Sequence, residues 1–356
     1  MKHLAINTLF CVWWVCGTFA QGEERVTWSL QSADVPLVPF YRFVGAGEPT
    51  PTTRSVAQWT GWDAGERLVC TSTNDSVRVA GVHLPRTWAL ALWNDGEQKA
   101  KVVLEGELPA GVYTVERLLL ANGGEITAVE RRNGLHQRVA GRVSRTEWLA
   151  GRSGLVLRFV ERTQAVEETL SQIRRSIWQS RVSPGVLSRL AALLREIDSH
   201  WYQVRASLRK NDVRLAARGV HRMLFLASGV RVASSKYTGS VRVAERAESL
   251  IDTLSELSSA ILNVVVSVCC EGDRLSAQVT NAGTQIWNVL RLVPDAGADE
   301  AVVLTNVKPM ERAEASLRLT EQQSVLAVTL SVLFNGGYAR LRVLYYPAEA
   351  NKEERP

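Results

Sequence analysis

The stretch that decides the fold is WALALWNDGEQKAKVVLEGELPAGVYTVERLLL, residues 88–120. Short apolar or alternating runs rich in Val and Leu, separated by turn residues, are typical of β-strands. The sequences Asn-Asp-Gly-Glu at 94–97 and Asn-Gly-Gly-Glu at 122–125 supply residues that tolerate the positive φ of hairpin turns. Similar runs recur through residues 21–160 at about ten-residue spacing, which predicts a β-sandwich.

The same stretch, followed after a gap by WLAGRSGLVLRFVER at 148–162, resembles the accessory C-terminal β-sandwich of bacterial glycoside hydrolases. In that family the sandwich follows the catalytic barrel. The resemblance therefore implies a sandwich fold and a link to carbohydrate chemistry. The barrel that would carry the catalytic residues has no counterpart in this sequence.

The apolar pattern changes from a period of two to a period of seven between residues 161 and 262. Alternating steps of three and four between apolar residues predict helices that pack side by side along a common seam. Pro184 suits the first turn of a helix, and Asn211 or Asp212 can cap the next one. Short connections make neighbouring helices antiparallel, so we expect a bundle of three or four helices.

Residues 263–348 return to strand patterns, with turns at Glu271-Gly272-Asp273 and Asn335-Gly336-Gly337. This part resembles the small immunoglobulin-like modules of bacterial surface and carbohydrate-active proteins. Their V-N-x-G strand and turn stands here as Val279-Thr280-Asn281-Ala282-Gly283, with an additional Thr. The polar tail, residues 349–356, is predicted to be disordered. The expected fold class is multidomain α+β: a β-sandwich, then an antiparallel helical bundle, then an immunoglobulin-like β-sandwich.

The first 20 residues read as a secretory signal peptide. A charged start is followed by an apolar run and then by Thr18-Phe19-Ala20, small residues at the end that a signal peptidase reads. The apolar run is shorter than the about 20 residues that cross a membrane. We expect cleavage after Ala20 and a secreted or periplasmic protein. Two of the five cysteines lie in this segment, and the remaining three, Cys70, Cys269 and Cys270, are too few for a disulfide scaffold.

The sequence contains no recognisable catalytic motif. His200 and His221 lack metal-ligand spacing, and neither a nucleophile elbow nor a phosphate-binding loop is present. We therefore expect no metal, no cofactor and no catalytic residue. Trp59 and Trp62 are candidates for stacking on sugar rings, although a sandwich core also uses tryptophan.

Positive charge gathers in the predicted bundle. The whole chain has a net charge of +6, and from Arg174 to Arg242 there are 14 Lys or Arg against three acidic residues. Like charges four residues apart repel each other on a helix, so such a surface suits an anionic partner. The candidate polyanion-binding residues are Arg205, Arg209, Arg214, Arg218 and Arg222.

These patterns predict a secreted, non-catalytic binding or structural protein, with an anionic cell-envelope polymer or polysaccharide as partner. The alternative is a carbohydrate-active enzyme, or an enzyme accessory subunit, with an unrecognised site in the first domain or at the junction of sandwich and bundle. A concave cleft lined by two carboxylates and the Trp59 and Trp62 rings would favour the alternative, and a convex surface without converging acids would favour the binding protein. Oligomerisation through the helices is a third possibility.

Overall fold

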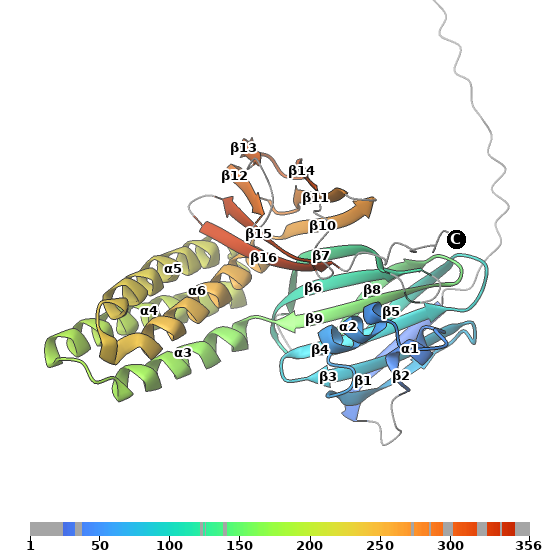
Figure 1. Ribbon diagram of the computed structural model, residues 1–356, viewed down its shortest axis with the longest axis horizontal. Coiled ribbons are helices and arrows are strands. Elements are labelled where there is room, and N and C mark those ends of the chain that lie inside the picture. The colour runs from blue at the N-terminus through green and yellow to red at the C-terminus, as the bar shows by residue number, and fades with distance from the viewer. Residues whose placement is uncertain are drawn as a thin grey trace, which may run out of the picture.

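The computed structural model describes residues 24–32, 38–121, 124, 126–137, 141–271, 274–284, 286–294, 302–318, 326–334 and 337–345. Within these residues the chain has a mixed α/β architecture with one large curled sheet, a smaller sheet and six α-helices. The large sheet and the long helices lie side by side, and the C-terminal strands lie above their junction in Figure 1.

The large sheet has twelve strands, and all of the pairings between them are antiparallel except that between β1 and β5. Its curl brings β5 and β8 opposite the central strands, so that apolar residues of both layers share one enclosed core. This arrangement is sandwich-like, as the N-terminal strand pattern predicts. In sheet order the strands are β14 (Arg312–Arg318), β11 (Arg274–Asn281), β10 (Val264–Glu271), β7 (Ile126–Gln137), β6 (Gly111–Leu120), β9 (Ser153–Glu161), β4 (Thr87–Asn94), β3 (Val77–Leu84), β2 (Glu66–Ser72), β1 (Glu24–Ser32), β5 (Ala100–Leu108) and β8 (Gly141–Leu149).

The sheet runs across the boundary that the sequence predicts between two separate β domains. Strand β10 pairs with β7, with Val265 opposite Arg132 and Val268 opposite Val129. Strands β11 and β14 then extend the sheet from β10. The predicted arrangement of sandwich, bundle and separate immunoglobulin-like domain is therefore not confirmed, because the strands before and after the bundle share one sheet. The physical reason is that β7 leaves one edge unpaired after its hairpin with β6, and an open edge accepts any strand that reaches it.

A second sheet of four strands completes the C-terminal part. It is antiparallel, and the β15–β16 hairpin predicted there is formed, with Phe334 opposite Gly337. Its order is β13 (Val302–Val307), β12 (Trp287–Pro294), β15 (Leu326–Phe334) and β16 (Gly337–Tyr345).

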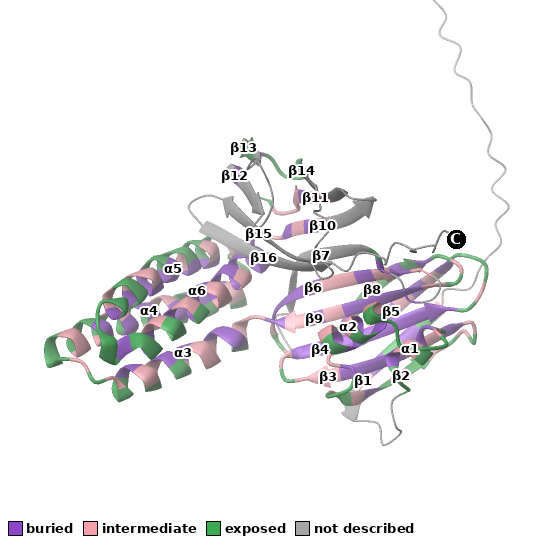
Figure 2. Cartoon of the chain, in the orientation of Figure 1, coloured by how far each residue is buried: buried purple, intermediate pink, exposed green. Residues whose placement is uncertain are grey.

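The four long helices follow the period-seven pattern of the sequence. Their seam residues form one buried core, seen as purple stripes along the helices in Figure 2. Pro184 begins α4, Asn211 ends it in the left-handed conformation (φ 59°), and the Asp212 side chain caps α5 by accepting from the Leu215 amide at 2.9 Å. The helices are α3 (Thr163–Gln179), α4 (Pro184–Lys210), α5 (Val213–Ser235) and α6 (Val241–Ile261), with the short 3-10 helix η2 (Thr238–Ser240) before α6.

Two short helices cover the outer face of the large sheet, α1 (Phe40–Phe43) and α2 (Pro51–Thr60) (Figure 1). The sequence interpretation assigned this region to strands and loops. A capping box between Thr50 and Thr53, with Pro51 in the first turn, starts α2, and Gly61 ends it with φ of 69°. The helices pack on the sheet in the same apolar cluster that contains buried residues of β10, β11 and β12.

The hairpin expectations have different outcomes. Strands β6 and β7 pair directly on either side of the predicted turn at 122–125, where Gly124 has φ of 84°. The turn at 94–97 does not close a hairpin, because β4 pairs with β3 and β9 whereas β5 pairs with β1 and β8. The predicted signal segment and the polar tail lie outside the described residues. No helix in the described part of the chain is long and apolar enough to cross a membrane.

Candidate functional site: a carboxyl-lined cavity between the sheet and the helices

The site begins where the last strand of the N-terminal part turns into the first long helix. Strand β9 ends at Glu161, and α3 begins two residues later at Thr163. Backbone hydrogen bonds hold the crossing in place: the Glu161 amide donates to the Arg86 carbonyl at 2.9 Å, and the Arg162 amide donates to the Val112 carbonyl at 2.8 Å. The Glu161 side chain is thus fixed at the junction of sheet and bundle.

The Glu161 side chain is buried, with 3% of the residue exposed, and it carries a titratable group. Its carboxylate accepts from the Thr163 amide at 2.8 Å, from the Gln164 amide at 2.6 Å and from the Thr163 hydroxyl. It therefore also caps the first turn of α3. Burial raises the pKa of the Glu161 carboxyl above its ordinary value, and these hydrogen bonds oppose the rise only in part.

Neighbouring residues on β6 make room for this carboxyl. A Cβ at Gly111 would lie 2.5 Å from Glu161 Oε1, so a larger residue would displace the carboxylate. Tyr113 stands opposite Glu161 in the β6–β9 register, and its hydroxyl donates to the Pro109 carbonyl at 2.8 Å. Burial, and then the Glu161 charge, raise the pKa of the Tyr113 phenol, which therefore remains a proton donor to Pro109.

The opposite wall comes from α3 and α4. Glu167 on α3 forms an ion pair with Arg205 on α4, with 2.8 Å between Oε1 and Nη1. Arg209 lies one turn further along α4, is exposed, and has no partner among the described residues. The α3–α4 wall therefore carries Glu167 and two arginines, whereas Glu161 lies at the end of β9.

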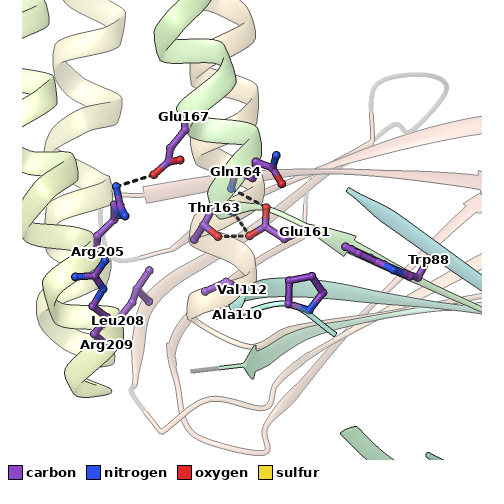
Figure 3. A pocket seen from close by; sticks show the side chains of 12 residues that line it. Trp88, Ala110, Val112, Glu161, Thr163, Gln164, Glu167, Arg205, Leu208 and Arg209 are labelled. Atoms are coloured by element: carbon purple, nitrogen blue, oxygen red, sulfur yellow. Dashed lines mark hydrogen bonds and ion pairs between the residues drawn. The ribbon is translucent and has the colours of Figure 1, made fainter. Parts of the chain in front are cut away.

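Between these walls lies a cavity of about 390 Å³, lined by the residues in Figure 3. Figure 3 shows the Glu161 carboxylate directed at the first turn of α3, the ion pair of Glu167 with Arg205 between α3 and α4, and Arg209 further along α4. Trp88 on β4 forms part of the lining, stacked on His83 with 5.0 Å between ring centroids. The volume falls in the range of about 300–1,000 Å³ that small-molecule sites have.

The two carboxyl groups of the cavity have different environments. Glu161 is buried, which favours its protonated form, whereas Glu167 is half exposed and paired with a guanidinium. Acid–base hydrolysis of a glycosidic bond uses two carboxyl groups whose environments differ. The cavity brings together a buried carboxyl whose pKa is raised and a second carboxyl that contacts a guanidinium.

The five predicted polyanion-binding arginines separate into two places. Arg205 and Arg209 line the cavity. Arg214 and Arg218 are exposed on α5. Arg222 pairs with Glu196 of α4 at 3.3 Å and lies over the Phe225 ring.

The candidate sugar-stacking tryptophans lie on or after α2, away from this cavity. Trp62 is 2% exposed and packs against Phe40 and Phe43, with its indole N–H donating to the Val38 carbonyl. Because its ring is covered by protein, the assignment of Trp62 to sugar stacking is corrected to a core role. Trp59 is half-buried, and the Arg158 guanidinium lies over its ring at 5.1 Å.

The other candidate ligands do not converge. His200 lies 4.0 Å from Glu196, and no group of three or more His, Cys, Asp or Glu in the described residues is placed to hold a metal ion. Cys70 carries a free thiol whose pKa burial raises to about 12. The side chains of Cys269 and Cys270 lie outside the described part.

The sequence interpretation missed Glu161, Glu167 and Trp88. One signal was available in the sequence. Glu161 stands at the end of a strand and two residues before a helix, so its carboxylate lies where the two elements meet. Nothing in the sequence shows that α4 returns to the same place, because that requires the length and direction of two helices.

Comparison with known proteins gives only partial matches. No family model and no curated protein matches the chain. Among solved structures, a family 30 endoxylanase from Clostridium papyrosolvens C71 matches with 14% identity over 27% of this chain and 24% of its own, at a TM-score of 0.20. A family 44 endoglucanase from Clostridium thermocellum matches with 10% identity over 30% of this chain and 22% of its own, at a TM-score of 0.22. The chain thus spans less than a quarter of either structure.

The expectation of a protein without enzymatic activity is corrected by this comparison. The matched structures are glycoside hydrolases, in line with the resemblance seen in the sequence, and the non-catalytic assignment is withdrawn. The matched segment is less than a third of the chain, so the likeness is to part of these enzymes.

Proposed function

We propose that the chain is a carbohydrate-active protein and that the cavity between sheet and helices is its saccharide site. In this proposal Glu161 is the proton donor, and Glu167 is the carboxylate that stabilises positive charge or activates water. Arg209 and the Trp88 side of the cavity hold the saccharide.

One observation supports the proposal more than any other. A single cavity contains a buried carboxyl whose pKa is raised and a second carboxylate held by an arginine. Glycoside hydrolysis uses two carboxyl groups in different roles, because one protonates the leaving oxygen while the other is negatively charged. Capping of α3 accounts for the hydrogen bonds of Glu161 but leaves unexplained why an open cavity lies beside it.

The polar lining also suits a sugar. Saccharide hydroxyls donate and accept hydrogen bonds, and the cavity presents carboxylates, guanidinium groups and the Gln164 side chain. The Trp88 ring and the Val112 and Leu208 side chains add apolar surface. A site that combines apolar walls with a few polar groups is the usual form of a small-molecule site.

The test is a screen of the purified protein against a panel of polysaccharides and oligosaccharides, with calorimetry for binding and reducing-sugar release for turnover. Glu161→Gln and Glu167→Gln remove the two acids. Glu168→Gln is the matched control, since Glu168 is on the same helix and also pairs with an arginine, Arg86 at 3.3 Å, but does not line the cavity.

We expect a saccharide that is bound and cleaved by the parent, with turnover reduced about 100-fold or more in both cavity variants and unchanged in Glu168→Gln. Equal turnover in all three variants would place the chemistry elsewhere. Gly111→Leu is a third cavity variant, which displaces the Glu161 carboxylate. If the saccharide still binds to Glu161→Gln, Glu167→Gln and Gly111→Leu as it does to the parent, the cavity is not the saccharide site.

A further inference from the structure

The outward face of α5 has an unusual composition for a soluble helix. Arg214, Arg218, Phe225 and Val232 project within an arc of about 40°, at the roughly 100° per residue of an α-helix. That arc points away from the buried residues of the same helix. The basic residues lie toward the start of α5, and the large apolar residues lie toward its end.

The apolar residues of this face are open to solvent. Phe225 is 66% exposed and Val232 is 50% exposed, and Leu215, near the start of α5 next to Arg214, is 52% exposed. Single exposed apolar residues are ordinary on a protein surface, but several along one helix indicate a surface that contacts something else. Phe225 also lies beneath the Arg222 guanidinium, 5.5 Å from the ring centroid.

The charge of the face is entirely positive. Helix α5, Val213–Ser235, contains no Asp or Glu. Its nearest acids are already engaged: Glu196 pairs with Arg222, Glu248 pairs with Arg231, and Asp212 caps the helix. Arg214 and Arg218 have no partner among the described residues. Like charges four residues apart destabilise a helix slightly, so an anionic surface would relieve this repulsion.

We propose that the outward face of α5 docks onto an anionic lipid surface. Phe225, Val232 and Leu215 enter the interface between headgroups and acyl chains, while Arg214 and Arg218 bind the anionic headgroups. This is how amphipathic helices with a basic polar border bind membranes in the plane of the interface. The inference is independent of the cavity and of its proposed function.

The apolar residues distinguish this partner from an anionic polysaccharide. A flat, hydrated polyanion would satisfy the arginines but would leave the Phe225 and Val232 side chains in water. A lipid surface accepts both kinds of group. The polymer expected from the sequence is therefore one of the alternative outcomes of the test below.

The experiment is co-sedimentation of the purified protein with vesicles of phosphatidylcholine alone and of phosphatidylcholine with 30 mol% phosphatidylglycerol, about a third anionic. All variants keep the same N-terminus. Arg214→Gln with Arg218→Gln removes the free charges, and Phe225→Ser removes the largest apolar group. Arg175→Gln with Arg195→Gln is the control of equal charge change on α3 and α4, and Tyr202→Ser, 77% exposed on α4, is the aromatic control.

We expect binding only to the anionic vesicles, weakened about 25-fold by the double arginine variant, since each arginine near such a surface contributes about fivefold. Phe225→Ser should weaken it about tenfold or more, and both controls should bind like the parent. Equal binding to the two kinds of vesicle, or equal losses in the α5 variants and the controls, would overturn the proposal. Binding to dextran sulfate that is insensitive to Phe225→Ser, without binding to vesicles, would assign the face to an anionic polymer instead.

Discussion

Replacement of Trp287 by alanine tests whether the N-terminal and C-terminal strands share one core. Trp287 on β12 is fully buried, and it belongs to the cluster that contains Phe40 and Trp62 of the α1–α2 region and Val156 of β9. Removing a buried tryptophan side chain costs about 3–5 kcal/mol, from lost apolar burial and from the cavity left behind. The size of the resulting shift in Tm depends on how many residues unfold together.

If both sets of strands form one cooperative unit of roughly 200 residues, a loss of about 4 kcal/mol lowers Tm by about 12 °C. If residues 263–348 were a separate domain, the same loss would lower the Tm of that smaller unit by about 24 °C and leave the rest unchanged. Scanning calorimetry measures the shift, and hydrogen exchange identifies the strands that open.

The control is Ile286→Ala, which removes a neighbouring apolar side chain that is 51% exposed, and it should shift Tm by about 3 °C or less. We expect Trp287→Ala to lower the Tm of a single unfolding transition. In that transition the backbone amides of β6 and β9 lose protection from hydrogen exchange together with those of β11. Two transitions, with loss of protection confined to β11 and β12, would refute the idea of a shared core.

Three other substitutions have expected outcomes. Gly106→Ala would place a Cβ 1.9 Å from the Trp28 ring, so we expect about 1–3 kcal/mol of destabilisation by overpacking, measured by urea unfolding; a loss under about 0.5 kcal/mol would contradict the close contact. Glu147→Gln neutralises a buried carboxylate that pairs with Arg117 at 2.6 Å and with Arg145 and should cost about 3–5 kcal/mol; an unchanged urea midpoint would contradict this. Because the folded pKa of Glu161 is raised, folding favours its protonated form, and the parent should lose stability relative to Glu161→Gln as pH rises from 4 through that pKa. A stability difference that does not change with pH would show that the carboxyl titrates normally.

The helices were predictable because their core is local in sequence. Apolar steps of three and four residues give the helices, and short turns with Pro184 and Asn211 give their ends and their antiparallel direction. Each of these signals lies within a few residues of the feature that it determines.

The strand order was not predictable in the same way. The apolar, valine-rich run at residues 264–271 predicts a strand, and the structure confirms this strand, but such a run carries no information about its partner. The partner of β10 is β7, more than a hundred residues earlier in the chain, and the whole helical bundle lies between them. Strands β7 and β10, which the sequence pattern assigns to separate domains, are neighbours in one sheet.

The sequence did not define the candidate site. The alternative hypothesis left two places open, the first domain and the junction of sandwich and bundle, and it expected the Trp59 and Trp62 rings in the cleft, whereas neither ring lines the cavity. Its acids were not recognised because Glu161 and Glu167 look like ordinary residues of a helix start in the sequence. Their different environments depend on the burial of Glu161 and on Arg205, which reaches Glu167 from another helix.

The central claim is that Glu161 donates a proton to a leaving sugar oxygen. The most direct test compares Glu161→Gln on two substrates of the same sugar: a natural glycoside, and an aryl glycoside whose leaving group needs no proton. We predict a loss of about 100-fold to 10,000-fold on the natural glycoside and a rate within about threefold of the parent on the aryl glycoside, since no proton transfer is then required. An equal loss on both substrates, or no loss on either, would contradict the role assigned to Glu161.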